Sequence, residues 1–136
     1  NRQADQIEVA VHALLARSQQ EQFSTIIEGV HVRPSIVKDC ALPSDTIVVP
    51  LLIAAEREKT LKAFFRGRAI SAPRRGRKHY LDNLDAIWDL QSLLLSEAET
   101  HDVPIVINEA EGGNMMTRMY SLISSVVLKE SSDPSD

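Results

Sequence analysis

The chain has 136 residues, of which 43% are hydrophobic and 25% are charged, and its formal net charge at pH 7 is −4. This composition is typical of a soluble globular domain, and it excludes fibrous and disorder-dominated proteins. The single cysteine excludes an internal disulfide framework, and no apolar run reaches the roughly 18 residues that a membrane span needs, so we expect a cytoplasmic protein with no membrane contact.

The charge is distributed unevenly along the chain. Between Lys59 and Leu81 there are eight basic residues, five of them Arg, and no acidic residue, which leaves a net charge of −12 on the remainder. An acidic body with one basic segment predicts a local anion-binding site. Nucleic acid is disfavoured as a partner, because the body is acidic and the basic loop RRGRK has few aromatic residues to stack on bases, with only Tyr80 at its end.

The first predicted elements are a helix and a strand. Residues 3–20 carry apolar side chains at helical spacing, which predicts an amphipathic helix. The stretch FSTIIEGVHVR (Phe23–Arg33) begins with aromatic and β-branched residues and ends its apolar run at Glu28, which predicts a buried parallel strand with a carboxylate at its end. Ligands bind at that edge of open α/β sheets, so Glu28 is the first candidate site residue, and His31 in the following loop is the second.

Two further apolar runs predict the rest of the sheet. Thr46–Ala54 (TIVVPLLIA) is the second strand, in which Pro50 indicates a bulge or an edge position, and Val103–Asn108 (VPIVIN) is the third. The strands alternate with predicted helices, which favours an α/β fold with a parallel sheet of about three strands. These helices cover residues 55–69, 80–100 and 115–129. The last is expected to bury the apolar residues Met116, Met119, Tyr120, Ile123 and Val127.

Two segments read as irregular. Ile70–His79 (ISAPRRGRKH) has no apolar period and is rich in Pro, Gly and Arg, which predicts an exposed, mobile loop. The last residues, SSDPSD (131–136), predict a disordered tail. We therefore expect one domain over residues 1–130.

An acid at a strand end and a mobile arginine loop suit one kind of chemistry. A carboxylate at a sheet edge can hold Mg²⁺, and arginines that close over the same edge can neutralise the charge of a phosphoryl group during its transfer. Arg is better suited than Lys to bidentate phosphate contacts. The sequence therefore favours phosphoryl transfer to a small metabolite.

Several segments, in order, resemble the C-terminal half of the 2-phosphoglycerate kinase family of P-loop kinases. They are IIEGVHV, TIVVPLLIA, FFRGRA, the arginine loop, KHYLDNLDAIWDLQSLL and VPIVIN. The similarity covers roughly Ile7 to Leu128, and EGVH is its most specific motif. The resemblance implies a three-layer P-loop kinase fold that is incomplete here, ATP and Mg²⁺ as cofactors, and a small phosphorylated metabolite as the substrate.

The resemblance also implies roles for individual residues. Glu28 would act near Mg²⁺, Arg68 and the arginines after it would belong to a lid over residues 66–79, and Asn108 would lie near the nucleotide base. The candidate residues are then catalytic Glu28, Arg68, Arg74, Arg75 and Arg77, substrate-binding His31, Arg33 and Lys78, and cofactor-binding Arg66 and Asn108, with Glu28 also the metal ligand.

The sequence departs from the family in three ways. No GxxxxGK[ST] stretch is present, so the backbone nest and lysine that hold ATP phosphates are missing. In the P-loop kinase layout, the strand that precedes the GxxxxGK[ST] loop lies between the strand ending in Glu28 and the strand Thr46–Ala54. Its absence would leave a gap with unpaired backbone in the sheet, so we expect a preceding segment or another chain to complete the sheet. The first residue is Asn rather than Met, which suggests a processed, cropped or partly ordered chain. Leu61, Asp85 and Trp88 stand where the family carries basic residues.

The departures leave a second hypothesis open. In it, the chain is a non-catalytic relative of P-loop kinases that senses a nucleotide or binds another protein. Binding of ATP without turnover would distinguish this relative from a kinase.

Overall fold

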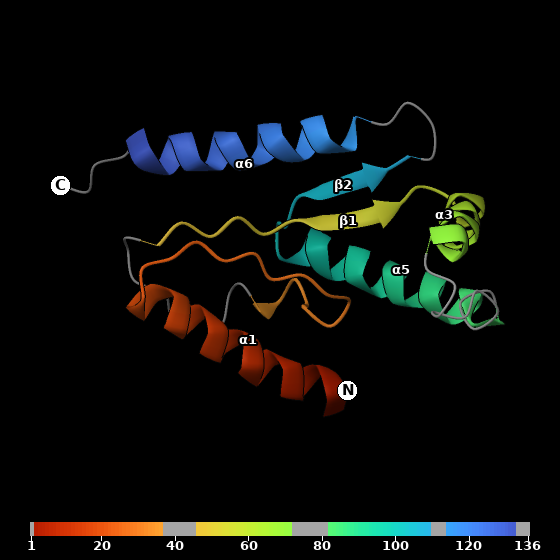
Figure 1. The fold of residues 1–136 in the computed structure, drawn as a ribbon, viewed down its shortest axis with the longest axis horizontal. Coiled ribbons are helices and arrows are strands. Elements are labelled where there is room, and N and C mark those ends of the chain that lie inside the picture. The colour runs from red at the N-terminus through yellow and green to blue at the C-terminus, as the bar shows by residue number, and fades with distance from the viewer. Residues whose placement is uncertain (1, 37–45, 72–81, 110–113, 133–136) are drawn as a thin grey trace.

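The computed structural model describes residues 2–36, 46–71, 82–109 and 114–132. Their elements follow the order α1 (Arg2–Gln20), β1 (Leu52–Ala55), α3 (Glu58–Ser71), α5 (Leu84–Thr100), β2 (Ile105–Asn108) and α6 (Met115–Ser132) (Figure 1). The predicted α/β class is confirmed, because β1 and β2 pair in parallel. The helix α6 continues through Ser132, into the segment predicted as a tail. None of the described helices combines the length and the hydropathy that crossing a membrane requires.

The two strands are shorter than predicted. The ladder runs from the pair Leu52 and Ile105 to the pair Ala55 and Asn108, and it opens with a hydrogen bond of 2.9 Å from the Leu52 N–H to the Pro104 carbonyl. The strand β2 begins directly after the turn that ends α5, so it offers no partner to residues 46–51. These residues lie in extended but unpaired chain, and the prediction of a strand from Thr46 is wrong for them.

The helices α1 and α5 end in the same kind of turn. In each, one residue adopts a positive φ, 51° at Gln22 and 53° at Asp102. The next residue then donates its N–H to a carbonyl five positions back, from Phe23 to Ser18 at 3.1 Å and from Val103 to Ala98 at 2.8 Å. This left-handed cap closes the helix and sends the chain back along the helix into an extended segment.

The core lies where α5 and α6 cover the strand pair from opposite sides. The helix α5 packs against β1, and α6 packs against β2 (Figure 1). Ala98 of α5 is completely buried, and Ala54 and Val106 of the strands are each 2% exposed. Leu84, Leu94 and Ala98 on α5 are buried, and their helical spacing agrees with the helix predicted over residues 80–100.

The predicted opening strand does not form in the described residues. Residues 23–29 have no regular secondary structure, and the sheet has two strands instead of about three. A strand is defined by hydrogen bonds to a neighbour. No described backbone bond joins residues 23–29 to residues 46–55. Segment 23–29 therefore has the apolar, β-branched composition of a strand, but no neighbouring strand is bonded to it in the described residues.

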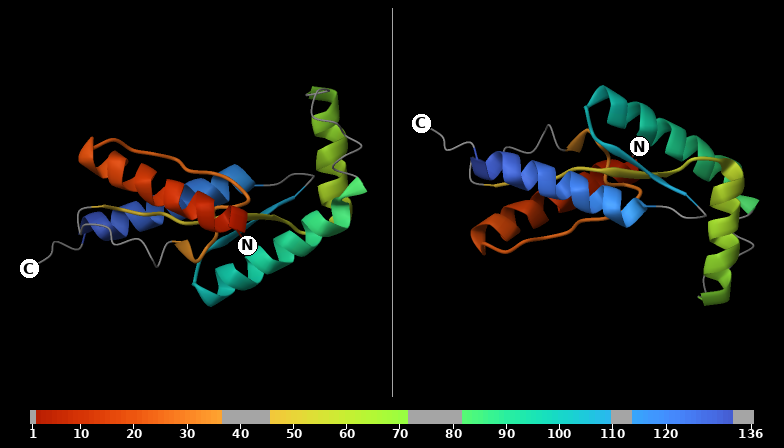
Figure 2. Two further views of the ribbon diagram at one scale, coloured as in Figure 1. Left: turned by 90° about the horizontal axis from the view of Figure 1, so that it is seen from below. Right: turned by 90° about the horizontal axis from the view of Figure 1, so that it is seen from above.

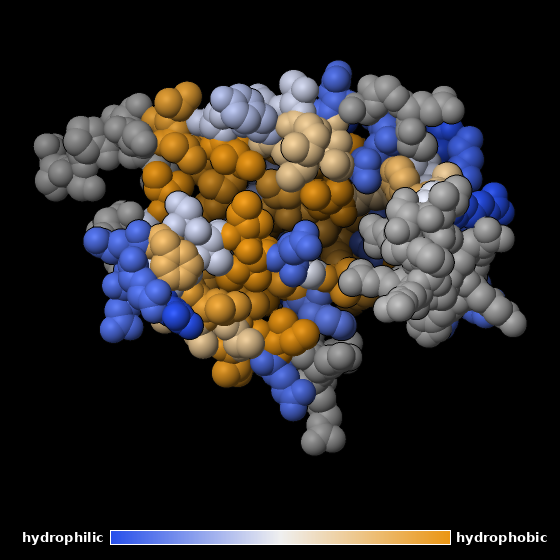
Figure 3. Space-filling model, in the orientation of Figure 1, coloured by the Kyte–Doolittle hydropathy of each residue, from blue (hydrophilic) through white to orange (hydrophobic). Residues whose placement is uncertain are grey.

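The face that Figure 3 shows is apolar between α6 and α1. Met116 and Tyr120 on α6 are 70% and 75% exposed, and Ile123 and Val127 are exposed as well, so the prediction that α6 buries these four residues is wrong. The reason is that α6 packs against β2 along one side only, where Met119 and Leu122 are half-buried. Other large apolar side chains of the described residues are also exposed, including Phe23, Ile26, Val30, Ile47 and Ile53.

Candidate functional site

The carboxyl ends of the two strands form the edge where ligands bind in parallel sheets. Ala55 and Asn108 are opposite each other at this edge. The chain continues from Ala55 into Glu56 and Arg57, whose exposed side chains are 3.4 Å apart. Asn108 thus lies at a strand end, as predicted, half-buried and next to β1. Its assignment to a nucleotide base stays a prediction.

A side-chain amide closes one side of this edge. The Ala55 N–H donates to Oε1 of Gln91 at 2.8 Å, and Nε2 of Gln91 donates to the Ala55 carbonyl at 3.1 Å. Gln91 lies on the face of α5 that packs against β1. Both backbone groups of Ala55 are therefore satisfied without a neighbouring strand.

On the other side of the edge, Glu109 follows β2. Its Oε1 lies 3.5 Å from Nη1 of Arg118 on α6, and both side chains are exposed. A shallow, open cavity lies beside this pair, between β2 and α6, lined by Ile105, Val106, Arg118, Ser121, Leu122 and Ser125. None of the predicted site residues lines it.

Glu28 is exposed, near the end of the extended segment after α1. Two hydrogen bonds anchor this part of the chain: Ser18 and Thr25 share one of 2.5 Å between their hydroxyls, and Nε2 of Gln19 donates to Oγ1 of Thr46 at 3.0 Å. Residues 23–29 and 46–55 consequently start near the end of α1 and run side by side in the same direction (Figures 1 and 2). No polar contact joins Glu28 to Asn108 or Arg66 in the described residues.

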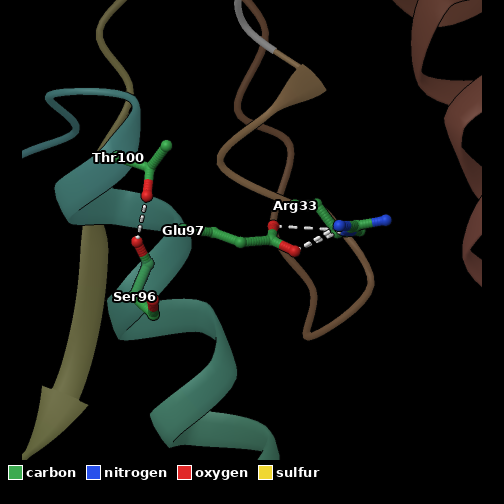
Figure 4. A network of polar contacts seen from close by, with 4 residues as sticks. All are labelled: Arg33, Ser96, Glu97 and Thr100. Carbon is green, nitrogen blue, oxygen red and sulfur yellow. Dashed lines mark hydrogen bonds and ion pairs between the residues drawn. The ribbon is translucent and has the colours of Figure 1, made fainter.

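Arg33 forms an ion pair with Glu97 of α5. Nε of Arg33 donates to both carboxylate oxygens, at 3.0 and 3.1 Å, and Nη2 donates to Oε1 (Figure 4). Pro34 and Ile36 beside it are buried, and His31 in the same turn is half-buried. Glu97 lies six residues after Gln91, about 9 Å along the helix axis, so this contact is remote from Ala55. The predicted roles of Arg33 and His31 in substrate binding stay predictions.

The predicted lid lies largely outside the described residues. This holds for Arg74, Arg75, Arg77 and Lys78. Arg66 is exposed on α3, and the backbone of Arg68 belongs to the same helix. The helix continues through Ser71, so residues 70 and 71, which were predicted to begin the loop, are helical. The helix α3 projects steeply away from the strands at their carboxyl end (Figure 2).

Of the groups that ATP and Mg²⁺ need, the described residues supply a carboxylate for the metal. No three His, Cys, Asp or Glu side chains among them come together as a metal site. A single carboxylate such as Glu28 suits Mg²⁺, which keeps several waters and takes its other ligands from phosphates. The nucleotide phosphates have no matching cradle in this sequence, because the glycine-rich loop and its lysine are absent.

Two residues at the edge were missed in the sequence. Arg57 comes two positions after the strand LIAA, so the same strand-end reasoning that selected Glu28 would have found it. Gln91 lies within the helix predicted over residues 80–100, but its bond to Ala55 joins residues 36 positions apart, for which the sequence carries no signal.

Comparison with known proteins finds several archaeal 2-phosphoglycerate kinases. The chain is 26% identical to that of Pyrococcus furiosus over 125 residues, 92% of this chain and 40% of the relative. It is 30% identical to that of Pyrococcus horikoshii over 106 residues, 78% and 34%, and 27% identical to that of Methanopyrus kandleri over 126 residues, 93% and 38%. The chain thus spans less than half the length of these relatives. No family model matches it, and no solved structure matches it significantly.

Proposed function

We propose that this chain, which is homologous to a part of the archaeal 2-phosphoglycerate kinases, supplies the acidic residue and the lid of an enzyme that transfers phosphate from ATP to a small metabolite. The homology over 92% and 93% of the chain carries this proposal. The names of the relatives favour 2-phosphoglycerate as the acceptor. The proposal places the enzyme in the cytoplasm.

The chain contributes positioning and charge in this proposal. Glu28 holds the metal from the end of the extended segment, directly or through water. The arginines from Arg66 to Arg77, with Lys78, bind phosphate oxygens, since the guanidinium fork matches their geometry. Asn108, at the carboxyl end of β2, contacts the nucleotide base in this proposal. When bound, Mg²⁺ neutralises part of the charge on the phosphates.

The phosphates of ATP need a further segment. The proposal assigns the glycine-rich loop to another part of a longer polypeptide, because the matched relatives are more than twice as long as the region they share with this chain. A separate chain that completes the sheet is the alternative source. In either case, turnover is expected only of the complete assembly.

Replacing Glu28 tests the mechanism. In the longer polypeptide, Glu28→Gln keeps the shape of the side chain but removes its charge, and we expect the ATP-dependent turnover of 2-phosphoglycerate to fall by roughly 100-fold. A coupled assay of ADP release measures this. Glu99→Gln, an exposed carboxylate on α5, is the matched control and should leave turnover unchanged.

The outcomes separate the two hypotheses. Unchanged turnover in Glu28→Gln would remove Glu28 from the mechanism. If the unmodified polypeptide binds ATP in calorimetry but shows no turnover, the non-catalytic, nucleotide-sensing reading is favoured. The substitutions Asp85 and Trp88 in the first turns of α5, where the family carries basic residues, are the observation on its side.

A further inference from the structure

The chain reverses in two consecutive turns directly after Glu28. In the first turn, the Val32 N–H donates to the Gly29 carbonyl at 3.0 Å. In the second, the Ile36 N–H donates to the Arg33 carbonyl at 3.1 Å. Arg33 therefore lies where the two turns meet, and a contact of its side chain fixes both of them.

The contact that Arg33 makes is with Glu97 on α5. Nε of Arg33 donates to both carboxylate oxygens and Nη2 donates to Oε1, so the guanidinium meets the carboxylate in a forked arrangement (Figure 4). A planar fork of this kind fixes orientation as well as distance, which the single ammonium of lysine does not. Glu97 is mostly buried, and Pro34 and Ile36 beside Arg33 are buried too. The chain after Glu28 is thus held against α5.

The helix α5 also holds the end of β1. The carboxamide of Gln91 bonds to both backbone groups of Ala55, the last residue of that strand. Glu97 lies six residues, or about 9 Å, further along the same helix. One helix therefore sets the position of a strand end at the ligand edge and that of the turn after Glu28. Loss of the contact with Glu97 would free Glu28 to move relative to that edge.

We propose that Arg33 and Glu97 are positioning residues, whose ion pair holds the turn after Glu28 on α5 and so sets where the Glu28 carboxylate lies relative to the bound metal. Arg33 acts through Glu28 and does not contact substrate. The proposal rests on the metal-binding role that the proposed function gives to Glu28. Because Mg²⁺ requires a nearly ideal octahedral geometry, a displaced carboxylate is a poorer ligand.

Hydrogen exchange of the Val32 amide, followed by NMR in the longer polypeptide, tests the anchor without measuring activity. Arg33→Met and Glu97→Met should each speed this exchange by about tenfold, since each removes one half of the ion pair. The exchanged pair, Arg33→Glu with Glu97→Arg, should recover slow exchange. Arg17→Met, which breaks an exposed ion pair on α1, is the matched control and should leave the Val32 amide unchanged.

Calorimetric titration with Mg²⁺ at a fixed ATP concentration tests the effect on Glu28. Arg33→Met and Glu97→Met should each raise the Mg²⁺ concentration for half-saturation by about tenfold, and the exchanged pair should restore it. A merely structural role would lower the fraction of competent protein without changing this concentration. In the Glu28→Gln background, Glu97→Met should cause no further change. The KM for 2-phosphoglycerate should stay within about twofold in both single variants.

Three results would overturn the proposal. The first is an unchanged Val32 amide in both single variants, with the Leu52 amide, which is bonded to Pro104, showing that they are folded. The second is faster exchange with an unchanged Mg²⁺ requirement. The third is a raised KM for 2-phosphoglycerate in Arg33→Met alone, which would make Arg33 a substrate ligand. A polypeptide that shows the expected exchange and Mg²⁺ binding but no turnover contradicts the kinase function and supports the positioning role.

Discussion

At the scale of single residues, the contact between Arg33 and Glu97 fixes the path of the chain after the segment that carries Glu28. It joins positions 64 residues apart, and Glu97 is only 13% exposed while Arg33 is 37% exposed. The burial of this pair is therefore intermediate. Surface ion pairs contribute about 0–1 kcal/mol to the free energy of unfolding, whereas removing one partner of a buried pair lowers it by about 3–5 kcal/mol.

Arg33→Met should lower the free energy of unfolding by about 1–2 kcal/mol, because it leaves Glu97 without its charged partner in a half-buried site. Urea denaturation measures the loss, and Arg33→Met combined with Glu97→Gln should recover part of it. Arg17→Met, which breaks an exposed pair with Glu21, is the control and should cost less than about 0.5 kcal/mol. If Arg33→Met leaves stability intact but weakens substrate binding, the side chain belongs to the substrate site instead.

The residues of the candidate site differ in how far the sequence could predict them. The place of Asn108 at the end of a strand followed from local pattern, an apolar run that ends in a polar residue. The same pattern predicted a strand end at Glu28, which the described residues do not form. The partner of Arg33 and the bond between Gln91 and Ala55 could not be predicted, because each depends on how distant segments pack. Arg74, Arg75, Arg77 and Lys78 lie outside the described residues, so their roles stay predictions.

At the scale of elements, the helix periods were readable while the strand limits were not. Residues 2–20 and 84–100 form the helices that their apolar spacing indicated. Strand composition alone was misleading in FSTIIEGVHVR, because a strand also needs a neighbour, and pairing is a property of the whole sheet. The run from Thr46 shows the same limit: β2 determines where β1 begins.

The cap of α1 gives a prediction at this scale. Gln22 holds φ at 51°, a conformation that costs an L-residue about 1–2 kcal/mol and glycine very little. Gln22→Gly should therefore raise the free energy of unfolding by about 0.5 kcal/mol after the added flexibility of the unfolded chain is subtracted. Gln22→Val should lower it by about 1 kcal/mol, since a branched side chain is least tolerated there.

Thermal and urea unfolding of the two variants measure these changes. Gln20→Gly, two positions earlier and still inside the helix, is the control and should be destabilising. If Gln22→Gly is destabilising to the same degree as Gln20→Gly, residue 22 does not hold a left-handed cap in solution.

At the scale of the whole molecule, the apolar face between α6 and α1 is the largest departure from an ordinary globular surface. Exposed apolar patches of this kind indicate contact with other protein or a tendency to associate. Ile26, Ile53 and Tyr120 are among the exposed apolar side chains of the described residues.

Tyr120→Lys should reduce self-association of the 136-residue chain, because it replaces a 75% exposed aromatic ring with a charge. Sedimentation velocity over a range of concentrations measures the change, and unfolding should shift by less than about 0.5 kcal/mol. Thr117→Lys adds the same charge on an exposed position of α6 without removing an apolar group, and it is the control. Equal effects of the two variants would show that net charge, and not the apolar face, governs association.

The projection of α3 has a mechanical consequence. Its 14 residues span about 21 Å, and its contacts with the strands are to β1. A short bend at Glu56 and Arg57 joins the helix to β1, so any tilt of the helix would pivot at the carboxyl end of this strand. A tilt of about 15° at this pivot displaces the far end by about 5 Å, so a small change in the backbone beside Arg57 becomes a large displacement at Ser71.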